Sequence, residues 1–105
     1  MSADFAIVIT TVDSEAKANE IAHRVVEKGL AACVQTCAIR SVYRWQGRLE
    51  EANEFRLDMK MRTLDYAALE AAIRAIHPYD TPEIVRIDIA EGYRPYLDWL
   101  AAAGK

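Results

Sequence analysis

The stretch from Ala31 to Met61 constrains the fold most, because its pattern requires a long pair of antiparallel strands. Apolar side chains alternate with charged ones along its second half, at Phe55, Leu57, Met59 and Met61. That spacing is the period of two of a β-strand. Gln46 and Gly47 supply turn chemistry near the middle. We therefore expect a long hairpin over residues 31–61, with its tip near residues 46–48 and an irregularity such as a bulge at residues 37–40.

Two helical patterns and two further strands flank this hairpin. Residues 5–12 are apolar and β-branched, which predicts a strand. After Ser14, apolar residues recur at three- and four-residue spacing up to Gly29, which predicts an amphipathic helix. A second helix is predicted from Asp65 to Pro78. Residues 85–89 alternate as a half-exposed last strand, and a short helix is predicted after Gly92.

The order of these elements predicts a fold class. Strand, helix, strand, strand, helix, strand, joined by right-handed crossovers, gives a ferredoxin-like α+β sandwich (βαββαβ) with an extra C-terminal helix. A length of 105 residues is typical of one domain. We therefore expect a single domain over residues 1–105, with both long helices on one face of an antiparallel sheet.

The opposite face of that sheet is also apolar and is therefore expected to be buried. The first strand has apolar side chains on both of its sides, whereas a strand with one wetted face should alternate apolar with polar. Large bare apolar patches are uncommon on monomers. We expect further subunits to cover this face. The alternative is that small residues make it only mildly apolar, namely Ala6, Ala31 and Ala32.

Charge and composition exclude several classes of protein. With 13 basic and 16 acidic residues well mixed, the chain lacks the basic face of a nucleic-acid binder. No apolar run is long enough for a membrane span, and no secretory signal pattern is present, which predicts a cytoplasmic location. Cys33 and Cys37 would lie about 13 Å apart on one strand, too far for a disulfide, so we expect reduced thiols.

With these segments assigned, the chain resembles the CutA divalent-cation-tolerance family over nearly its whole length. The matching motifs are Thr10-Thr11, Leu30-Ala31-Ala32-Cys33-Val34, Ser41-Val42-Tyr43-Arg44-Trp45-Gln46-Gly47, Glu54, Lys60, His77-Pro78-Tyr79, Pro82-Glu83-Ile84 and Tyr96-Leu97 with Trp99. The resemblance implies a ferredoxin-like homotrimer similar in architecture to the PII signalling proteins. It also implies an association with tolerance to copper and other divalent metals, without an established catalytic activity.

The first functional hypothesis is weak binding of copper or another divalent ion, with no cofactor required. Soft and borderline ions prefer imidazole and thiolate ligands, which His77, Cys33 and Cys37 would supply. Asp80 and Glu83 are near enough to His77 to orient it or to share the ion. Since the two thiols are widely spaced, ligands would have to come from a bulge or across a subunit interface. The alternative for both cysteines is burial as small apolar residues.

The second hypothesis is a PII-like trimer that senses a small anionic or nucleotide ligand in clefts between subunits. The residues expected to line such a cleft are Tyr43, Arg44, Trp45, Glu54, Lys60 and Tyr79. Packing of the aromatic rings at the hairpin, and an ordinary ion pair between Glu54 and Lys60, remain alternatives. No nucleophile elbow, metalloprotease helix or paired catalytic carboxylates are present, so we expect a protein that is not an enzyme.

Overall fold

The long hairpin forms in the computed structural model, which describes residues 3–103. Strands β2 (Cys33–Trp45) and β3 (Arg48–Arg62) pair antiparallel over their full length, from Cys33 opposite Lys60 to Trp45 opposite Arg48. Gln46 and Gly47 have φ angles of 50° and 78°. Positive φ at both central residues is the geometry of a type I′ turn, whose twist suits a two-residue hairpin.

The prediction of a bulge at residues 37–40 is wrong. Each residue of this stretch faces one partner on β3, in unbroken register. A bulge would place two residues of one strand opposite a single residue of the other. The strands therefore continue without interruption, and side chains along β2 keep alternating between the two faces of the sheet.

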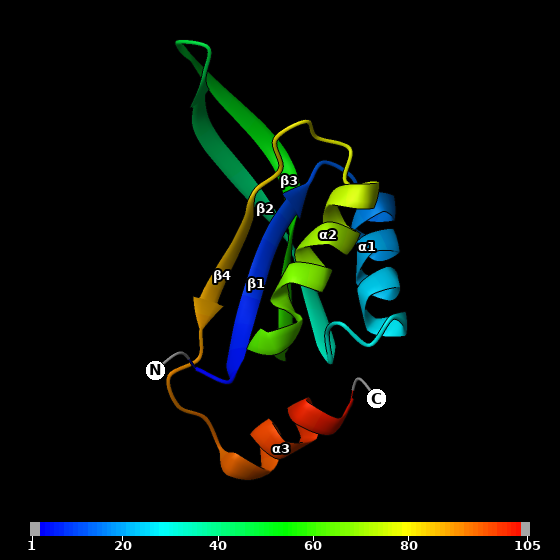
Figure 1. Ribbon diagram of the computed structural model, residues 1–105. Coiled ribbons are helices and arrows are strands. Elements are labelled where there is room, and N and C mark those ends of the chain that lie inside the picture. Colours follow the sequence, from blue (N-terminus) through cyan, green and yellow to red (C-terminus); the bar gives the residue numbers. More distant parts are fainter. Residues whose placement is uncertain (1–2, 104–105) are drawn as a thin grey trace.

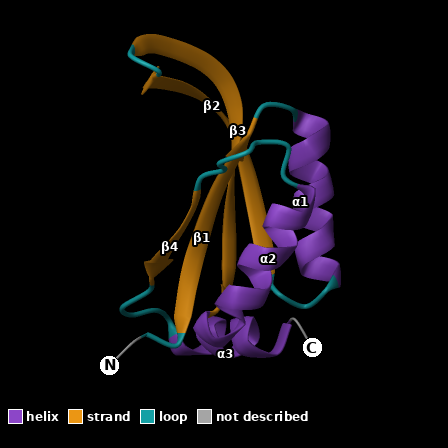
Figure 2. Cartoon of the chain, turned by 45° about the horizontal axis from the view of Figure 1, so that its top comes forward, coloured by secondary structure: helices purple, strands orange, loops and turns teal. Residues whose placement is uncertain are grey.

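Strand β1 (Phe5–Val12) pairs with both β3 and β4 (Ile84–Asp88), and the sheet order is β2-β3-β1-β4. Helices α1 (Glu15–Glu27) and α2 (Tyr66–Ile76) lie together on one face (Figures 1 and 2). This arrangement confirms the predicted ferredoxin-like α+β sandwich. The hairpin projects beyond the ends of both helices (Figure 1), and β2 and β4 form the two edges of the sheet.

The ends of the helices follow local chemistry. Ser14 accepts a hydrogen bond from the Lys17 main-chain N–H at 3.1 Å and so caps α1. Gly29 follows the end of α1 with a φ of 71°, which glycine adopts without a steric penalty. The short 3₁₀ helix η1 (Thr63–Asp65) precedes α2. Asp65 stands at the N-cap position of α2, but its carboxylate pairs with Arg62 (3.1 Å) instead of making a capping bond.

The main core fills the space between the sheet and the two long helices. Its largest fully buried side chains include Ile21, Leu57, Met59, Leu69 and Ile73. Leu57, Met59 and Met61 belong to the same side of β3, which is the alternation that the sequence predicts. This core holds β1 and β3 in the centre of the sheet.

Strand β4 alternates as predicted, and its apolar side faces away from the helices. Its apolar residues Val85 and Ile87 lie opposite Ile9 and Ile7 and remain 43% and 53% exposed on the open face of the sheet. Arg86 lies on the helix side, where its guanidinium sits 5.7 Å from the centre of the Tyr66 ring. An edge strand can place a long cation this way because its head reaches solvent while its stem packs.

Helix α3 (Arg94–Ala103) closes one end of the molecule (Figure 1). Leu97 and Leu100 pack with Phe5 in a second, smaller core. Gly92 permits this approach, since an added Cβ would stand 3.0 Å from a Leu97 methyl carbon. Among residues 3–103, no helix has the length and hydropathy needed to cross a membrane.

Candidate functional site

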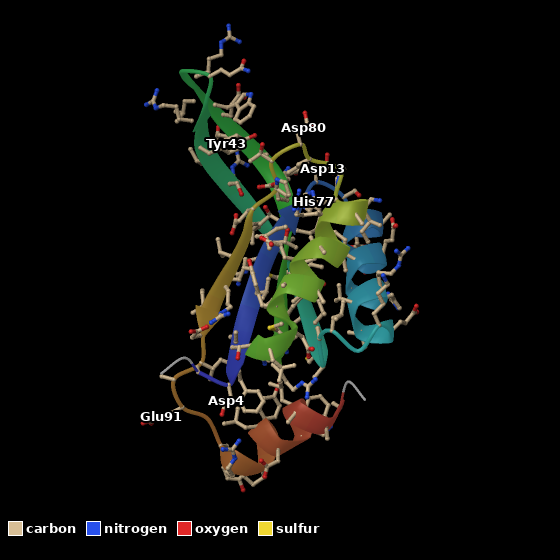
Figure 3. The ribbon with its side chains drawn as sticks, viewed as in Figure 1. Asp4, Asp13, Tyr43, His77, Asp80 and Glu91 are labelled. Atoms are coloured by element: carbon tan, nitrogen blue, oxygen red, sulfur yellow. The ribbon has the colours of Figure 1, made fainter. Side chains whose placement is uncertain are left out.

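A groove lies between the β2–β3 hairpin and the loop that connects α2 to β4. Its volume is about 720 Å³, and it is lined by Thr11, Ser41, Val42, Tyr43, Trp45, Ala52, Glu54, Tyr79, Asp80, Thr81 and Glu83. Tyr43 on the hairpin and Asp80 on the loop lie at the same end of the molecule (Figure 3). The volume is in the range of about 300–1,000 Å³ that is typical of small-molecule sites.

The uninterrupted hairpin explains how its wall of the groove forms. Ser41, Tyr43 and Trp45 are two residues apart on β2 and therefore share one side of the strand. The register places Ala52 directly opposite Ser41, and Glu54 follows two residues later on β3. The long hairpin thus presents an aromatic and acidic surface to the loop.

His77 fixes the start of the loop through two bonds to the main chain. Its Nε2 donates to the Thr11 carbonyl oxygen at 2.9 Å, and its Nδ1 accepts the Tyr79 main-chain N–H at 3.1 Å. A carbonyl only accepts and an amide N–H only donates, so the ring is the neutral tautomer with its proton on Nε2. Burial lowers the pKa of His77, although the Thr11 bond and the carboxylate of Asp13 act in the opposite direction.

Tyr79 links the loop to the hairpin. Its hydroxyl donates to Glu54 Oε2 at 2.8 Å, and its ring packs edge-on against His77 with the ring centres 4.8 Å apart. Burial raises the pKa of Tyr79, and the bond to the Glu54 carboxylate raises it further, so the phenol stays protonated. Glu54 itself is only 8% exposed.

The five predicted metal ligands are not brought together in one chain. Asp80 and Glu83 line the groove, whereas both His77 nitrogens already hold main-chain groups. Cys33 and Cys37 are free thiols on β2, half-buried and exposed respectively. Within the described part of the chain, no three His, Cys, Asp or Glu side chains are grouped closely enough to hold an ion. An ion at His77 would have to displace one of its two bonds.

Four of the six predicted cleft residues do meet: Tyr43, Trp45, Glu54 and Tyr79. Two do not. Arg44 lies on the other side of β2, where its Nη1 donates to the Gly47 carbonyl oxygen at 3.5 Å. Lys60 lies at the far end of β3, with its Nζ 5.5 Å from the centre of the Tyr96 ring. The alternative of a Glu54–Lys60 ion pair is therefore not found within one chain.

The sequence reasoning missed some of the groove. Five lining residues were not predicted, namely Thr11, Ser41, Val42, Ala52 and Thr81, and Asp80 and Glu83 were assigned to a metal instead. The alternation of β2 could have pointed to Ser41, which shares a side with Tyr43 and Trp45. No local signal places Thr11 here, because its position depends on how β1 ends beside the loop.

Comparisons with known proteins decide the family. A sequence model of the family described as CutA1 divalent ion tolerance protein matches residues 6–103. The chain belongs to the CutA family. A divalent-cation tolerance protein CutA of Thermus thermophilus is 47% identical over 95 residues, covering 90% of this chain and 92% of the relative.

Solved CutA structures share the fold. The divalent cation tolerance protein (Cut A1) from Thermus thermophilus has a TM-score of 0.91 at 45% identity, covering 94% of this chain and 97% of its own. CutA from Synechococcus elongatus PCC7942 has a TM-score of 0.94 at 35% identity, covering 99% and 93%. The likeness therefore extends over nearly the whole of each chain, including the hairpin and the groove loop.

The charged residues that line the groove of this CutA chain are all acidic. Three carboxylates line it, from Glu54, Asp80 and Glu83, and none of its lining residues is Lys, Arg or His. The three aromatic rings add negatively polarised faces. The walls supplied by one chain therefore disfavour the anionic or nucleotide ligand that the sequence suggested.

Proposed function

We propose that this protein acts in tolerance to divalent cations as a homotrimer that binds copper-type ions weakly and catalyses no reaction. The observation that carries the proposal is the CutA family match over residues 6–103, together with a 47% identical relative named a divalent-cation tolerance protein. A cytoplasmic location remains a prediction from the sequence.

The free thiols on the open face support ion binding between copies. Cys37 is exposed on edge strand β2, so a second copy packed against this face could complete a site around it. Thiolates are ligands of soft and borderline ions such as copper and zinc. Since the described residues of one chain form no group of three ligands, weak binding that depends on assembly is the form we propose.

The bonds of His77 and Tyr79 argue against either group acting as a general base. A general base needs a free nitrogen or oxygen within reach of a substrate proton. Both His77 nitrogens are bonded to the main chain, and Tyr79 is held in its protonated form beside Glu54. These groups stiffen the loop and hold it against β1 and the hairpin.

Titration with copper(II) and, separately, with zinc(II) against a competing chelator tests the proposal. We expect micromolar or weaker binding by the wild-type protein, a loss of more than about tenfold in Cys37→Ser, and little change in His77→Ala. Loss in His77→Ala alone would contradict thiol ligation and favour the histidine-centred site that the sequence suggested. An absence of binding by the wild-type protein at millimolar copper would contradict the metal-binding proposal as a whole.

A further inference from the structure

The groove contains a buried carboxylate that has no cationic partner in the portion of the chain that the structure describes, which points to a binding site. Glu54 is more than nine-tenths buried, and its hydrogen-bond partner is the neutral phenol of Tyr79. Among residues 3–103, no Lys, Arg or His side chain forms an ion pair with Glu54. Buried carboxylates are costly unless a cation or several hydrogen bonds compensate the charge. The site is electrostatically incomplete.

The remaining walls suit a cation with an organic surface. Tyr43, Trp45 and Tyr79 contribute three aromatic rings, and Asp80 and Glu83 add two more acids on the loop side. Aromatic faces attract ammonium groups, and quaternary ammonium ligands are recognised by cages of such rings. The Tyr79 phenol stays neutral, because it keeps its proton while its hydroxyl donates a hydrogen bond to Glu54.

A bare metal ion fits this groove poorly. An ion needs several oxygen, nitrogen or sulfur atoms that converge on one point within about 2.0–2.6 Å. The acids here are distributed around a volume of about 720 Å³, and the described residues contain no group of three metal ligands. The space and the aromatic walls instead match a small organic molecule.

We propose that this groove binds a small organic ammonium cation, with Glu54 as its buried counter-charge and Tyr43, Trp45 and Tyr79 packed around the alkylated nitrogen. The exposed acids Asp80 and Glu83 would draw the cation in from solvent. The groove wall lies on the same face of the sheet as Cys37, which is two residues along β2 from the partner of Glu54. The two proposals nevertheless use different side chains and are tested separately.

The test uses choline and its uncharged analogue 3,3-dimethylbutan-1-ol, which have similar shapes. The chain has two tryptophans, so Trp99→Phe leaves Trp45 as a fluorescent reporter inside the groove. We expect saturable quenching or a spectral shift by choline in the assembled protein, in buffer containing EDTA. The neutral analogue should bind at least about tenfold more weakly, because it lacks the cation–π and ionic terms.

Matched variants locate the site. In the Trp99→Phe background, Glu54→Gln keeps an acceptor for Tyr79 but removes the charge, and we expect about tenfold weaker choline binding. Asp80→Asn lies at an exposed position and should weaken binding without affecting folding. Glu91→Gln removes an acid at the opposite end of the molecule (Figure 3) and should change nothing.

Three results with choline would overturn the proposal. They are equal binding of choline and its neutral analogue, no saturable signal with choline, and unchanged affinity in both Glu54→Gln and Asp80→Asn. Tighter binding of adenosine monophosphate than of choline would also overturn it and restore the anionic ligand. Because EDTA removes divalent ions, each of these outcomes leaves the metal-tolerance proposal standing.

Discussion

His77 joins two segments that are far apart in the sequence. Its Nε2 bond to Thr11 ties it to the end of β1, and its Nδ1 bond to Tyr79 shapes the loop that follows α2. Protonation of Nδ1 would turn an acceptor into a donor that faces another N–H. The neutral ring is therefore part of the loop's architecture.

This arrangement makes stability depend on pH in a definite direction. Burial depresses the pKa of folded His77 below its ordinary value of 6.5, against the raising effects of the Thr11 bond, Asp13 and Glu54; Lys17 acts with burial. The unfolded chain then binds the proton more readily. We expect the His77 contribution to be complete above pH 6.5 and to be lost as the pH falls from 6.5 through the lower folded pKa.

Urea denaturation between pH 7.5 and about 5 measures this effect. His77→Gln should flatten the decline in unfolding free energy over that window, because glutamine does not titrate. His23 is exposed on α1, so His23→Gln is the matched control and should leave the decline in place. A wild-type profile that is flat from pH 7 to 5 would contradict the role given to the neutral ring.

Among the elements, the β2–β3 hairpin depends most on its turn. Gly47 has a φ of 78°, and nothing lies within 4 Å of the place a Cβ would occupy. Gly47→Ala therefore tests backbone strain without a steric clash. We expect a local cost of about 1 kcal/mol, which corresponds to about fivefold faster amide exchange in the paired residues next to the turn.

Gln46→Gly is the companion variant. Gln46 also has a positive φ, of 50°, and glycine adopts that conformation without the penalty that glutamine incurs. Exchange near the tip should then stay the same or slow down. Faster exchange in Gln46→Gly together with slower exchange in Gly47→Ala would show that the turn is not of the type described here.

The elements were predictable where the pattern is local. The hairpin and both long helices follow from period-two and period-3.6 spacing and from cap residues such as Ser14 and Gly29. The orientation of β4 could not be predicted from the sequence. A period of two separates the two sides of a strand, but it does not say which side faces the helices. The bulge predicted at residues 37–40 is absent, because the residue types of this stretch also fit an ordinary strand.

The site was predictable only in part, for a reason of topology. Glu54, Tyr79 and the aromatic residues of the hairpin could be named as candidates from the sequence. The bond between Tyr79 and Glu54 spans 25 residues and needs the three-dimensional arrangement of loop and hairpin. Arg44 and Lys60 were misplaced because alternation and strand length put them on another side and at another end.

For the whole molecule, the open face of the sheet is the surface on which we expect other copies to pack. Ile7, Ile9, Val85 and Ile87 form adjacent pairs there, and the β4 members remain about half exposed. Burying such side chains against other copies is favourable by about 25 cal/mol per Å². We expect light scattering to give about three times the 11.8 kDa chain mass.

Ile87→Asp should reduce that mass toward a single chain, since a carboxylate at the contact would be buried without a partner. The chain should stay folded, because Ile87 is 53% exposed within one copy. Val26→Asp, on the exposed side of α1, is the control and should leave the assembly intact. A wild-type protein whose apparent mass at micromolar concentration equals the 11.8 kDa of one chain would contradict the proposed trimer.

The two unpaired edges of the sheet, β2 and β4, have a consequence for how copies can join. Suppose that the β2 edge of one copy hydrogen-bonds to the β4 edge of the next. Each added copy then leaves an unpaired β2 edge at one end of the assembly and an unpaired β4 edge at the other. Such head-to-tail contacts stop growing only when the rotation per step brings the chain of copies back on itself. If a substitution changed the rotation per step so that the ring could not close, the same contacts would give an open filament.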